Sequence, residues 1–139
     1  MAVRKRTPEQ IMGKDLNAIN TIIDCIRKAQ KFSDFSDITD FTNDEMAFDA
    51  CIRNIEVIGE AVKRLSSEIR KNHPEIEWSQ LAGFRDRLIH QYDKVDARIL
   101  WATLKSELPL EIPKLEKIKQ ELLQRKTPTK SQGNIPKLF

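Results

Sequence analysis

Residues 85–92 of this 139-residue chain, RDRLIHQY in one-letter code, combine a fixed cation, a proton-transfer group and a phenol. Arg85 keeps its charge and has a planar fork that matches phosphate oxygens, whereas His90 can give or take a proton near neutral pH. Together these two side chains suit the cleavage of a phosphodiester. The chain has only two histidines and one tyrosine, so the close spacing of His90 and Tyr92 favours a functional site.

The relative directions of these side chains depend on whether one helix carries them all. On a regular helix Asp86 and His90, four apart, are neighbours, so Asp86 could hold one ring nitrogen and fix its tautomer. Arg85 and Tyr92 fall within about 20° of one line, but Arg85 and His90 diverge by about 140°. Either the helix loosens before His90 or two chains pair and bring these residues together across a two-fold interface. We prefer the pairing.

Spacing alone also allows purely structural roles. Residues 85–87 could form a solvated helix face, and His90 could be hydrogen-bonded at a helix end. Tyr92 could cover the core with its ring and expose its hydroxyl. Glu56 and Glu60, one helical turn apart, are typical of a polar helix face. They could also place a carboxylate beside a cleft between the two paired chains. The residues by themselves leave these alternatives open.

The composition narrows the class of protein. Only four glycines occur, and runs of β-branched and aromatic residues are scarce, which favours a single all-α domain. No apolar run approaches the roughly 18 residues of a membrane helix, so we expect a soluble, cytoplasmic protein. Cys25 and Cys51 lie in apolar helical patterns and are expected to be buried free thiols. No spacing typical of metal ligands is present, so we expect chemistry without a metal or other cofactor.

The formal charge of +3 is unevenly distributed along the chain. Residues 1–6 carry +3, residues 7–113 carry −5 and residues 114–139 carry +5. Basic ends can strengthen contact with nucleic acid phosphates, or they can serve only as solubilising ends. We divide the chain into a basic N-terminal extension over residues 1–6, a helical domain over residues 7–125 and a C-terminal tail over residues 126–139 that is expected to be disordered.

Four to five helices in an up-and-down bundle are predicted to position the site. The first begins after Thr7, which forms a capping box with Gln10, and runs to about Gln30. Its apolar face repeats at steps of three and four residues. The members of this face are Met12, Leu16, Ile19, Ile23 and Ile26. A connecting loop is expected over residues 32–42.

The second helix is the clearest element in the sequence and is predicted to carry a long apolar seam. Asn43 or Asp44 caps it, and it is expected to run unbroken until just before Pro74. The seam consists of Cys51, Ile55, Ile58, Val62, Leu65 and Ile69. Gly59 interrupts this helix at a cost of roughly 1 kcal/mol relative to alanine, which indicates a close helix crossing. His73 is expected to cap the C-terminal end.

Two further helices are predicted after Pro74. Ser79 is expected to cap a short helix that carries the segment 85–92 near its end. Asp96 is expected to cap the last helical stretch, which Pro109 and Pro113 bend or break.

The motif Arg85-x4-His90-x-Tyr92 resembles the R-x4-H-x-Y signature of HEPN domains. Its surroundings resemble the HepT-like toxins of HepT–MntA toxin–antitoxin systems over roughly residues 10–123. Four further segments agree, namely IGEAV at 58–62, P-x-I-x-W at 74–78, GFRD at 83–86 and LP at 108–109.

The resemblance implies an α-helical homodimer with a metal-independent ribonuclease site in the cleft between the chains. Arg85 would bind phosphate and His90 would be the catalytic histidine, with Asp86 at the supporting polar position. Tyr92 matches the tyrosine to which a partner nucleotidyltransferase antitoxin of the MNT type adds AMP, which would neutralise the toxin by blocking RNA. Transfer RNA or messenger RNA is the implied substrate, and the dimer would assemble further with its antitoxin.

The sequence thus predicts the toxin of a type II or type VII-like toxin–antitoxin system. The alternative is a non-catalytic helical module that uses the same cleft to bind a nucleotidyltransferase or a nucleotide. Cleavage of RNA in the presence of a chelator, and its loss in the variant His90→Ala, would support the ribonuclease over the non-catalytic module. A DNA-binding role is weaker, because no helix presents a dense row of arginines and lysines to a groove.

Overall fold

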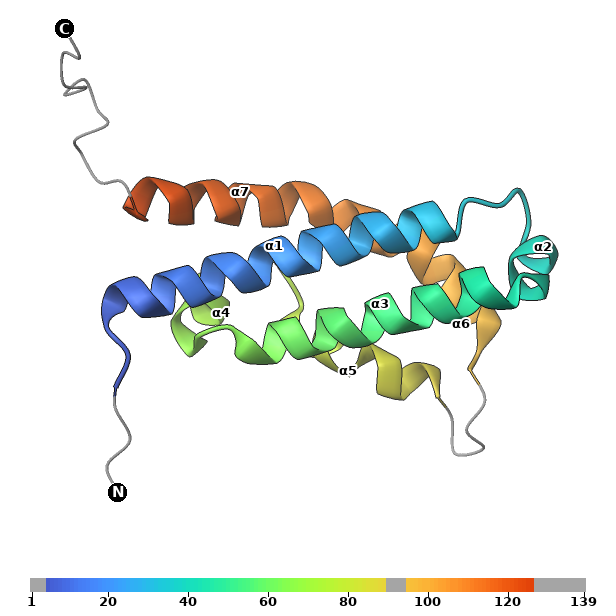
Figure 1. Cartoon of the computed structure of the whole chain (residues 1–139), viewed down its shortest axis with the longest axis horizontal. Coiled ribbons are helices and arrows are strands. Elements are labelled where there is room, and N and C mark those ends of the chain that lie inside the picture. The colour runs from blue at the N-terminus through green and yellow to red at the C-terminus, as the bar shows by residue number, and fades with distance from the viewer. Residues whose placement is uncertain (1–4, 90–94, 127–139) are drawn as a thin grey trace, which may run out of the picture.

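Helices make up every regular element that the computed structural model describes, which covers residues 5–89 and 95–126 (Figure 1). In order, the elements are α1 (Pro8–Phe32), α2 (Ile38–Asn43), α3 (Glu45–Arg64), α4 (Ser67–Asn72), α5 (Trp78–Leu88), α6 (Ala97–Ala102), the π-helical turn η1 (Thr103–Glu107) and α7 (Leu108–Lys126). The predicted all-α fold is confirmed. None of these described helices is long and apolar enough to cross a membrane.

Three long helices form the body of the molecule, with α1 packed against both α3 and α7 (Figure 1). The apolar positions predicted for the second helix are all buried, at 5% exposure or less. Those of the first helix are either buried or packed against the core. Cys25 and Cys51 are buried free thiols, as predicted. The core therefore forms where the apolar faces of these helices pack together.

The helix starts predicted from the caps Thr7, Asp44 and Asp96 are confirmed. The backbone N–H of Gln10 donates to Thr7 Oγ1 at 3.1 Å, and the backbone N–H of Thr7 donates to Gln10 Oε1 at 2.8 Å. Asp44 caps α3 by accepting from the backbone N–H of Ala47 at 2.9 Å. Asp96 caps α6, and each of these carboxylates satisfies N–H groups that have no partner within the helix.

The prediction of a loop over residues 32–42 is wrong at its end, where the short helix α2 forms. Asp37 caps this helix by accepting from the backbone N–H of Asp40 at 2.9 Å. Phe41 is fully buried and packs against Phe35, Phe48 and Trp101. One cap and one buried ring are sufficient to order a helix too short to show an apolar period.

The prediction of an unbroken second helix is also wrong, because the helix is interrupted at Leu65–Ser66 and a separate helix, α4, follows. Ser66 caps α4 and also donates its hydroxyl to Asp15 Oδ2 at 2.6 Å, while its backbone N–H donates to Asp15 Oδ1 at 2.8 Å. Asp15 is 4% exposed and needs these donors, since burying an unpaired carboxylate is costly. His73 is the C-cap of α4, as predicted.

Two predictions about the later helices need correction. Glu77, not Ser79, is the N-cap of α5, and the indole N–H of Trp78 donates to the carbonyl of His73 at 3.0 Å, which fixes the start two residues earlier. The helical stretch after Asp96, predicted to be bent or broken by its prolines, is not broken, although its α-helical pattern is interrupted before Pro109. The π-helical turn η1 precedes Pro109 and α7 continues through Pro113.

Gly59 lies where α3 crosses α5, as its position in the sequence predicts. A Cβ atom built on Gly59 would stand 2.9 Å from the carbonyl oxygen of Ala82, which is backbone and cannot turn aside. The missing side chain is therefore what lets α5 approach α3. Gly13 in α1 has nothing within 4 Å of such an atom.

We expect Gly59→Ala to destabilise the protein by about 1–3 kcal/mol, because the methyl group must push α5 away from α3. Gly13→Ala is the matched control and should stabilise it by up to about 1 kcal/mol through helix propensity alone. Urea unfolding followed by circular dichroism measures both variants. Equal stabilisation by the two substitutions would contradict the close crossing.

Candidate functional site

Helix α5 presents Arg85 at the surface by burying its opposite face. Trp78, Phe84 and Leu88 are 7%, 7% and 0% exposed, whereas the side chain of Arg85 is 47% exposed. The spacing of these buried residues fixes which way the helix faces, and the crossing at Gly59 fixes how near it lies to α3. Arg85 is therefore placed by packing and remains open to solvent.

Two carboxylates lie beside the guanidinium of Arg85. Glu56 Oε2 on α3 is 3.8 Å from Arg85 Nε, and Asp86 Oδ1 is 3.6 Å from Arg85 Nη1. Glu60 lines the same pocket, which has a volume of about 250 Å³. Two roles were expected for Glu56 and Glu60, a polar helix face or a carboxylate beside the site. The second role, a carboxylate beside the candidate site, is the one observed.

These ion pairs are weak enough to be exchanged for a ligand. Their distances are long, and the side chains of Glu56 and Asp86 are 33% and 79% exposed. Exposed pairs of this kind contribute about 0–1 kcal/mol. A phosphate that offers two oxygens to the guanidinium fork makes shorter, charge-assisted hydrogen bonds. Arg85 is consequently held in place at rest and remains able to bind an anion.

The helix that carries Arg85 ends at Leu88, before the rest of the motif. The backbone N–H of Ile89 donates to the carbonyl of Arg85 at 3.2 Å, and the backbone N–H of Asp96 donates to the carbonyl of Leu88 at 3.0 Å. Ile89 also pairs with Val95 in an antiparallel bridge. The prediction of one regular helix through the motif is wrong, because this pairing replaces the helical hydrogen bonds.

The end of α5 changes the predicted geometry of the site. The predicted pairing of Asp86 with His90 and the predicted alignment of Arg85 with Tyr92 both assume one helix through the motif, whereas α5 ends at Leu88. His90 and Tyr92 themselves lie outside the described residues. Helix α5 ends before His90, as the first of the two predicted routes requires, and the convergence of Arg85 with His90 stays a prediction. Because Ile89 and Val95 pair, the segment that contains His90 and Tyr92 begins and ends at the C-terminal end of α5.

Arg87, two residues after Arg85, has a different environment. Its Nη2 donates to the carbonyl of Gln80 at 3.0 Å, and its guanidinium lies 5.4 Å from the centroid of the Phe84 ring. These contacts tie Arg87 to its own helix. It is therefore a structural arginine, and the motif spacing had singled out Arg85 rather than Arg87.

Neither cysteine is chemically suited to act as the nucleophile. Burial raises the pKa of Cys51 to about 12, and burial likewise raises the pKa of Cys25. Cys51 Sγ also lies 3.5 Å from the carbonyl oxygen of Ala29 in the core. Within residues 5–89 and 95–126, no group of three His, Cys, Asp or Glu side chains is arranged to hold a metal ion.

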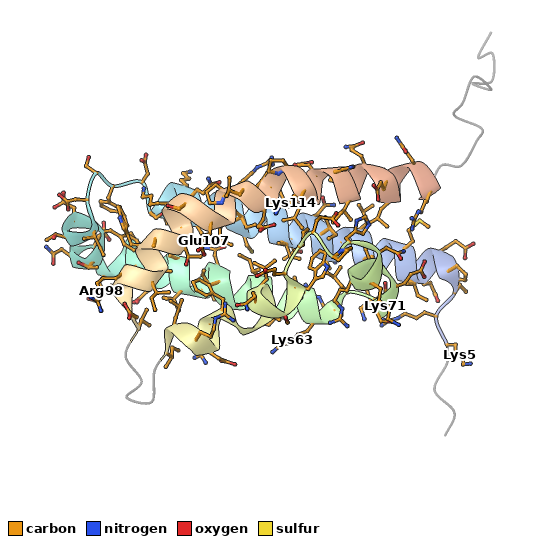
Figure 2. All side chains as sticks on the ribbon, turned by 180° about the vertical axis from the view of Figure 1, so that it is seen from behind. Lys5, Lys63, Lys71, Arg98, Glu107 and Lys114 are labelled. Carbon is orange, nitrogen blue, oxygen red and sulfur yellow. The ribbon has the colours of Figure 1, made fainter. Side chains whose placement is uncertain are left out.

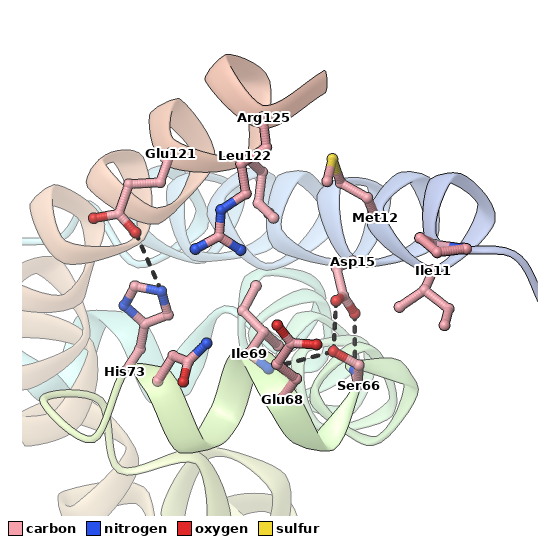
Figure 3. A pocket seen from close by; sticks show the side chains of 12 residues that line it. Ile11, Met12, Asp15, Ser66, Glu68, Ile69, His73, Glu121, Leu122 and Arg125 are labelled. Atoms are coloured by element: carbon pink, nitrogen blue, oxygen red, sulfur yellow. Dashed lines mark hydrogen bonds and ion pairs between the residues drawn. The ribbon is translucent and has the colours of Figure 1, made fainter. Parts of the chain in front are cut away.

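A second pocket lies between α1, α4 and α7, with a volume of about 240 Å³ (Figure 3). Asp15 and Ser66 are joined there, and His73 Nε2 is 3.3 Å from Glu121 Oε2. His73 Nδ1 is also 3.1 Å from Glu75 Oε2, and hydrogen bonding by the backbone of Glu75, reinforced by His73, lowers the pKa of Glu75. These bonds join the end of α4 to α7, and Arg85 does not line this pocket.

The model of the family described as Ribonuclease HepT-like matches residues 22–122. The chain belongs to this family. The matched range contains the segment 85–92, and the predicted resemblance of the chain to HepT-like HEPN proteins is confirmed. Comparison with solved structures gives no match.

Three relatives support the same assignment. The HepT-like chain is 45% identical over 120 residues to "Putative RNase TTE0752" of Caldanaerobacter subterraneus, covering 86% of this chain and 97% of that protein. It is 37% identical over 102 residues to "Probable ribonuclease HepT" of Thermococcus cleftensis, covering 73% and 93%. It is 37% identical over 110 residues to "Putative RNase MJ0127" of Methanocaldococcus jannaschii, covering 78% and 91%.

In native HepT-like protein at pH 8, we expect iodoacetamide to leave Cys51 unmodified. A pKa of about 12 leaves roughly one thiolate in ten thousand at that pH, and the thiolate is the reactive form. Mass spectrometry after a timed reaction measures the modification, with protein unfolded in guanidinium chloride as the reactive control. Equal rates in native and unfolded protein would contradict the burial of this thiol.

Proposed function

We propose that this protein is a metal-independent endoribonuclease that acts as the toxin of a toxin–antitoxin system. The observation that carries the proposal is the match to the Ribonuclease HepT-like family across the segment that holds Arg85, His90 and Tyr92. The exposure of Arg85 beside the end of α5 supports it. The substrate is proposed to be transfer RNA or messenger RNA in the cytoplasm.

In the proposed reaction the ribose 2′-hydroxyl attacks the adjacent phosphorus. A bond forms between the 2′-oxygen and phosphorus, the bond to the 5′-oxygen breaks, and the products carry a 2′,3′-cyclic phosphate and a 5′-hydroxyl. Arg85 binds the non-bridging oxygens, where negative charge develops. His90 donates a proton to the leaving 5′-oxygen. Asp86 has a supporting role beside Arg85, to which it lies close at 3.6 Å.

The proposed site is completed by a second copy of the chain. In a two-fold cleft, one His90 accepts the proton of the 2′-hydroxyl and the other His90 protonates the leaving oxygen. Two copies of Arg85 then surround one phosphate. The exposure of Arg85 at the surface of the single chain supports this arrangement, because nothing in the described part of the chain closes over it.

The proposed antitoxin is a nucleotidyltransferase of the MNT type that transfers AMP to the hydroxyl of Tyr92. The segment with Tyr92 starts and ends at the C-terminal end of α5, within which Arg85 lies. A nucleotide on Tyr92 would bring a phosphate and a base to the cleft. That phosphate would compete with RNA for the guanidinium of Arg85.

We expect Arg85→Ala and His90→Ala each to lower the rate of RNA cleavage in EDTA by about 10²–10⁴-fold, since one variant removes charge stabilisation and the other removes proton transfer. Gel analysis of purified dimers with total cellular RNA measures the loss. Arg27→Ala is the matched control, because Arg27 is a partly exposed arginine on α1 that pairs with Glu116 at 3.0 Å. Intact RNA with the unmodified wild-type protein would favour the non-catalytic binding module instead.

We expect Tyr92→Phe to keep RNA cleavage and to lose neutralisation by the antitoxin, because only the phenol oxygen that accepts AMP is removed. Incubation with the cognate nucleotidyltransferase and ATP, followed by intact-mass measurement, should show one added AMP on the wild-type chain and none on the variant. Addition of AMP to the variant at the wild-type rate would place the modification on another residue.

A further inference from the structure

A groove runs along the bundle from the pocket of Arg85 towards α4. It has a volume of about 950 Å³ and is lined by residues from α3, α4 and α5 and from the connection before α5. Lys63, Ala82 and Asp86 line both this groove and the pocket of Arg85, so the two hollows are continuous. Small residues deepen it, since Ala82 and Gly83 lie along α5 where longer side chains would fill the space.

Three cations line the groove, and two of them, Arg70 and Lys71, do not line the pocket of Arg85. The three are Lys63 at the end of α3 and Arg70 and Lys71 in α4, and all are exposed. Figure 2 shows Lys63 and Lys71 on the side of the bundle where α4 and α5 lie. None of the three forms an ion pair with a carboxylate of the described chain. Their charges are therefore available to an anionic ligand.

The balance of positive and negative side chains changes along the groove. In the pocket of Arg85, the carboxylates Glu56, Glu60 and Asp86 outnumber the cations. In the larger groove, the three cations outnumber the two carboxylates, Glu77 and Asp86. A polyanion is therefore attracted to the α4 end and is held loosely near Arg85, where the phosphate must displace weak ion pairs. The RNA is thus attracted by cations that lie away from the bond that is cut, and at that bond its phosphate exchanges with weakly paired carboxylates. Such an arrangement suits a strand that must be bound, cut and released.

We propose that this basic groove, with Lys63, Arg70 and Lys71, holds the sugar–phosphate backbone of a single-stranded RNA next to the phosphate at Arg85. The inference rests on the proposed ribonuclease function and assigns the path of its substrate. A single strand fits better than a duplex, because the groove of about 950 Å³ leads into a pocket of only about 250 Å³. The three side chains contact phosphates and leave the sequence of the RNA unread.

The test is the salt dependence of RNA cleavage by the triple variant Lys63→Gln, Arg70→Gln, Lys71→Gln. The probe is a fluorogenic single-stranded RNA of mixed sequence, and the protein is the full chain. We expect KM to rise on the order of tenfold at 0.1 M salt, with kcat within about twofold of wild type. The slope of log(kcat/KM) against log salt should become shallower by about 0.7 for each lost phosphate contact.

The matched control removes the same charge from other surfaces. Lys28→Gln, Lys31→Gln, Lys117→Gln changes three exposed lysines on α1 and α7, none of which lines the groove. This control should keep the wild-type KM and salt slope. Thermal unfolding of both triple variants must match wild type within a few degrees, and the single variant Lys71→Gln, with a proportionate effect, serves if the triple variant does not fold.

Each outcome separates the two claims. If the wild-type protein cleaves RNA and the groove variant has the same KM and salt slope, the proposed role of the groove is overturned. The proposed ribonuclease function is then unaffected. Equal losses in the groove and control variants show an effect of net charge alone and also overturn the groove. Unchanged RNA kinetics with slower modification by the nucleotidyltransferase assign these cations to that partner instead. No cleavage and no RNA binding by wild type overturn both proposals.

Discussion

The close crossing of α3 and α5 at Gly59 is the contact on which the candidate site depends. Helix α5 has only eleven residues and makes its main packing contacts with α3, so its position is set where Gly59 faces the carbonyl of Ala82. The crossing brings Arg85 next to Glu56 and positions the end of α5, where Ile89 pairs with Val95. A methyl group at position 59 would alter all of these relations together.

The electrostatics of the site combine restraint with access. Glu56 and Asp86 hold the guanidinium of Arg85 at distances where partly exposed pairs are weak, which limits its motion without occupying it fully. Two of the uncompensated cations, Arg70 and Lys71, lie further along the groove. An RNA would then meet net positive charge first and exchange carboxylates for a phosphate only at the reacting bond. This order favours binding along the strand over tight binding of any single anion.

Local signals in the sequence predicted much of the fold. The capping box at Thr7, the cap at Asp96 and the apolar seam of α3 each depend on residues a few positions apart, and all were confirmed. The break at Ser66 could not be predicted, because it depends on the buried carboxylate of Asp15, fifty-one residues earlier. The end of α5 likewise depends on pairing between Ile89 and Val95. Arg85 could be singled out from its motif, whereas its contact with Glu56 required the helix crossing.

The chemistry of the RNA ends tests the central claim most directly. Purified, unmodified protein in EDTA would be given an RNA oligonucleotide and its matched version with a 2′-deoxyribose on the 5′ side of the cleaved phosphate. The account predicts a 2′,3′-cyclic phosphate and a 5′-hydroxyl from the first and no cleavage of the second, because the attacking hydroxyl is missing. Cleavage of the deoxy substrate, or products with a 5′-phosphate, would contradict a reaction driven by Arg85 and His90 on the ribose hydroxyl.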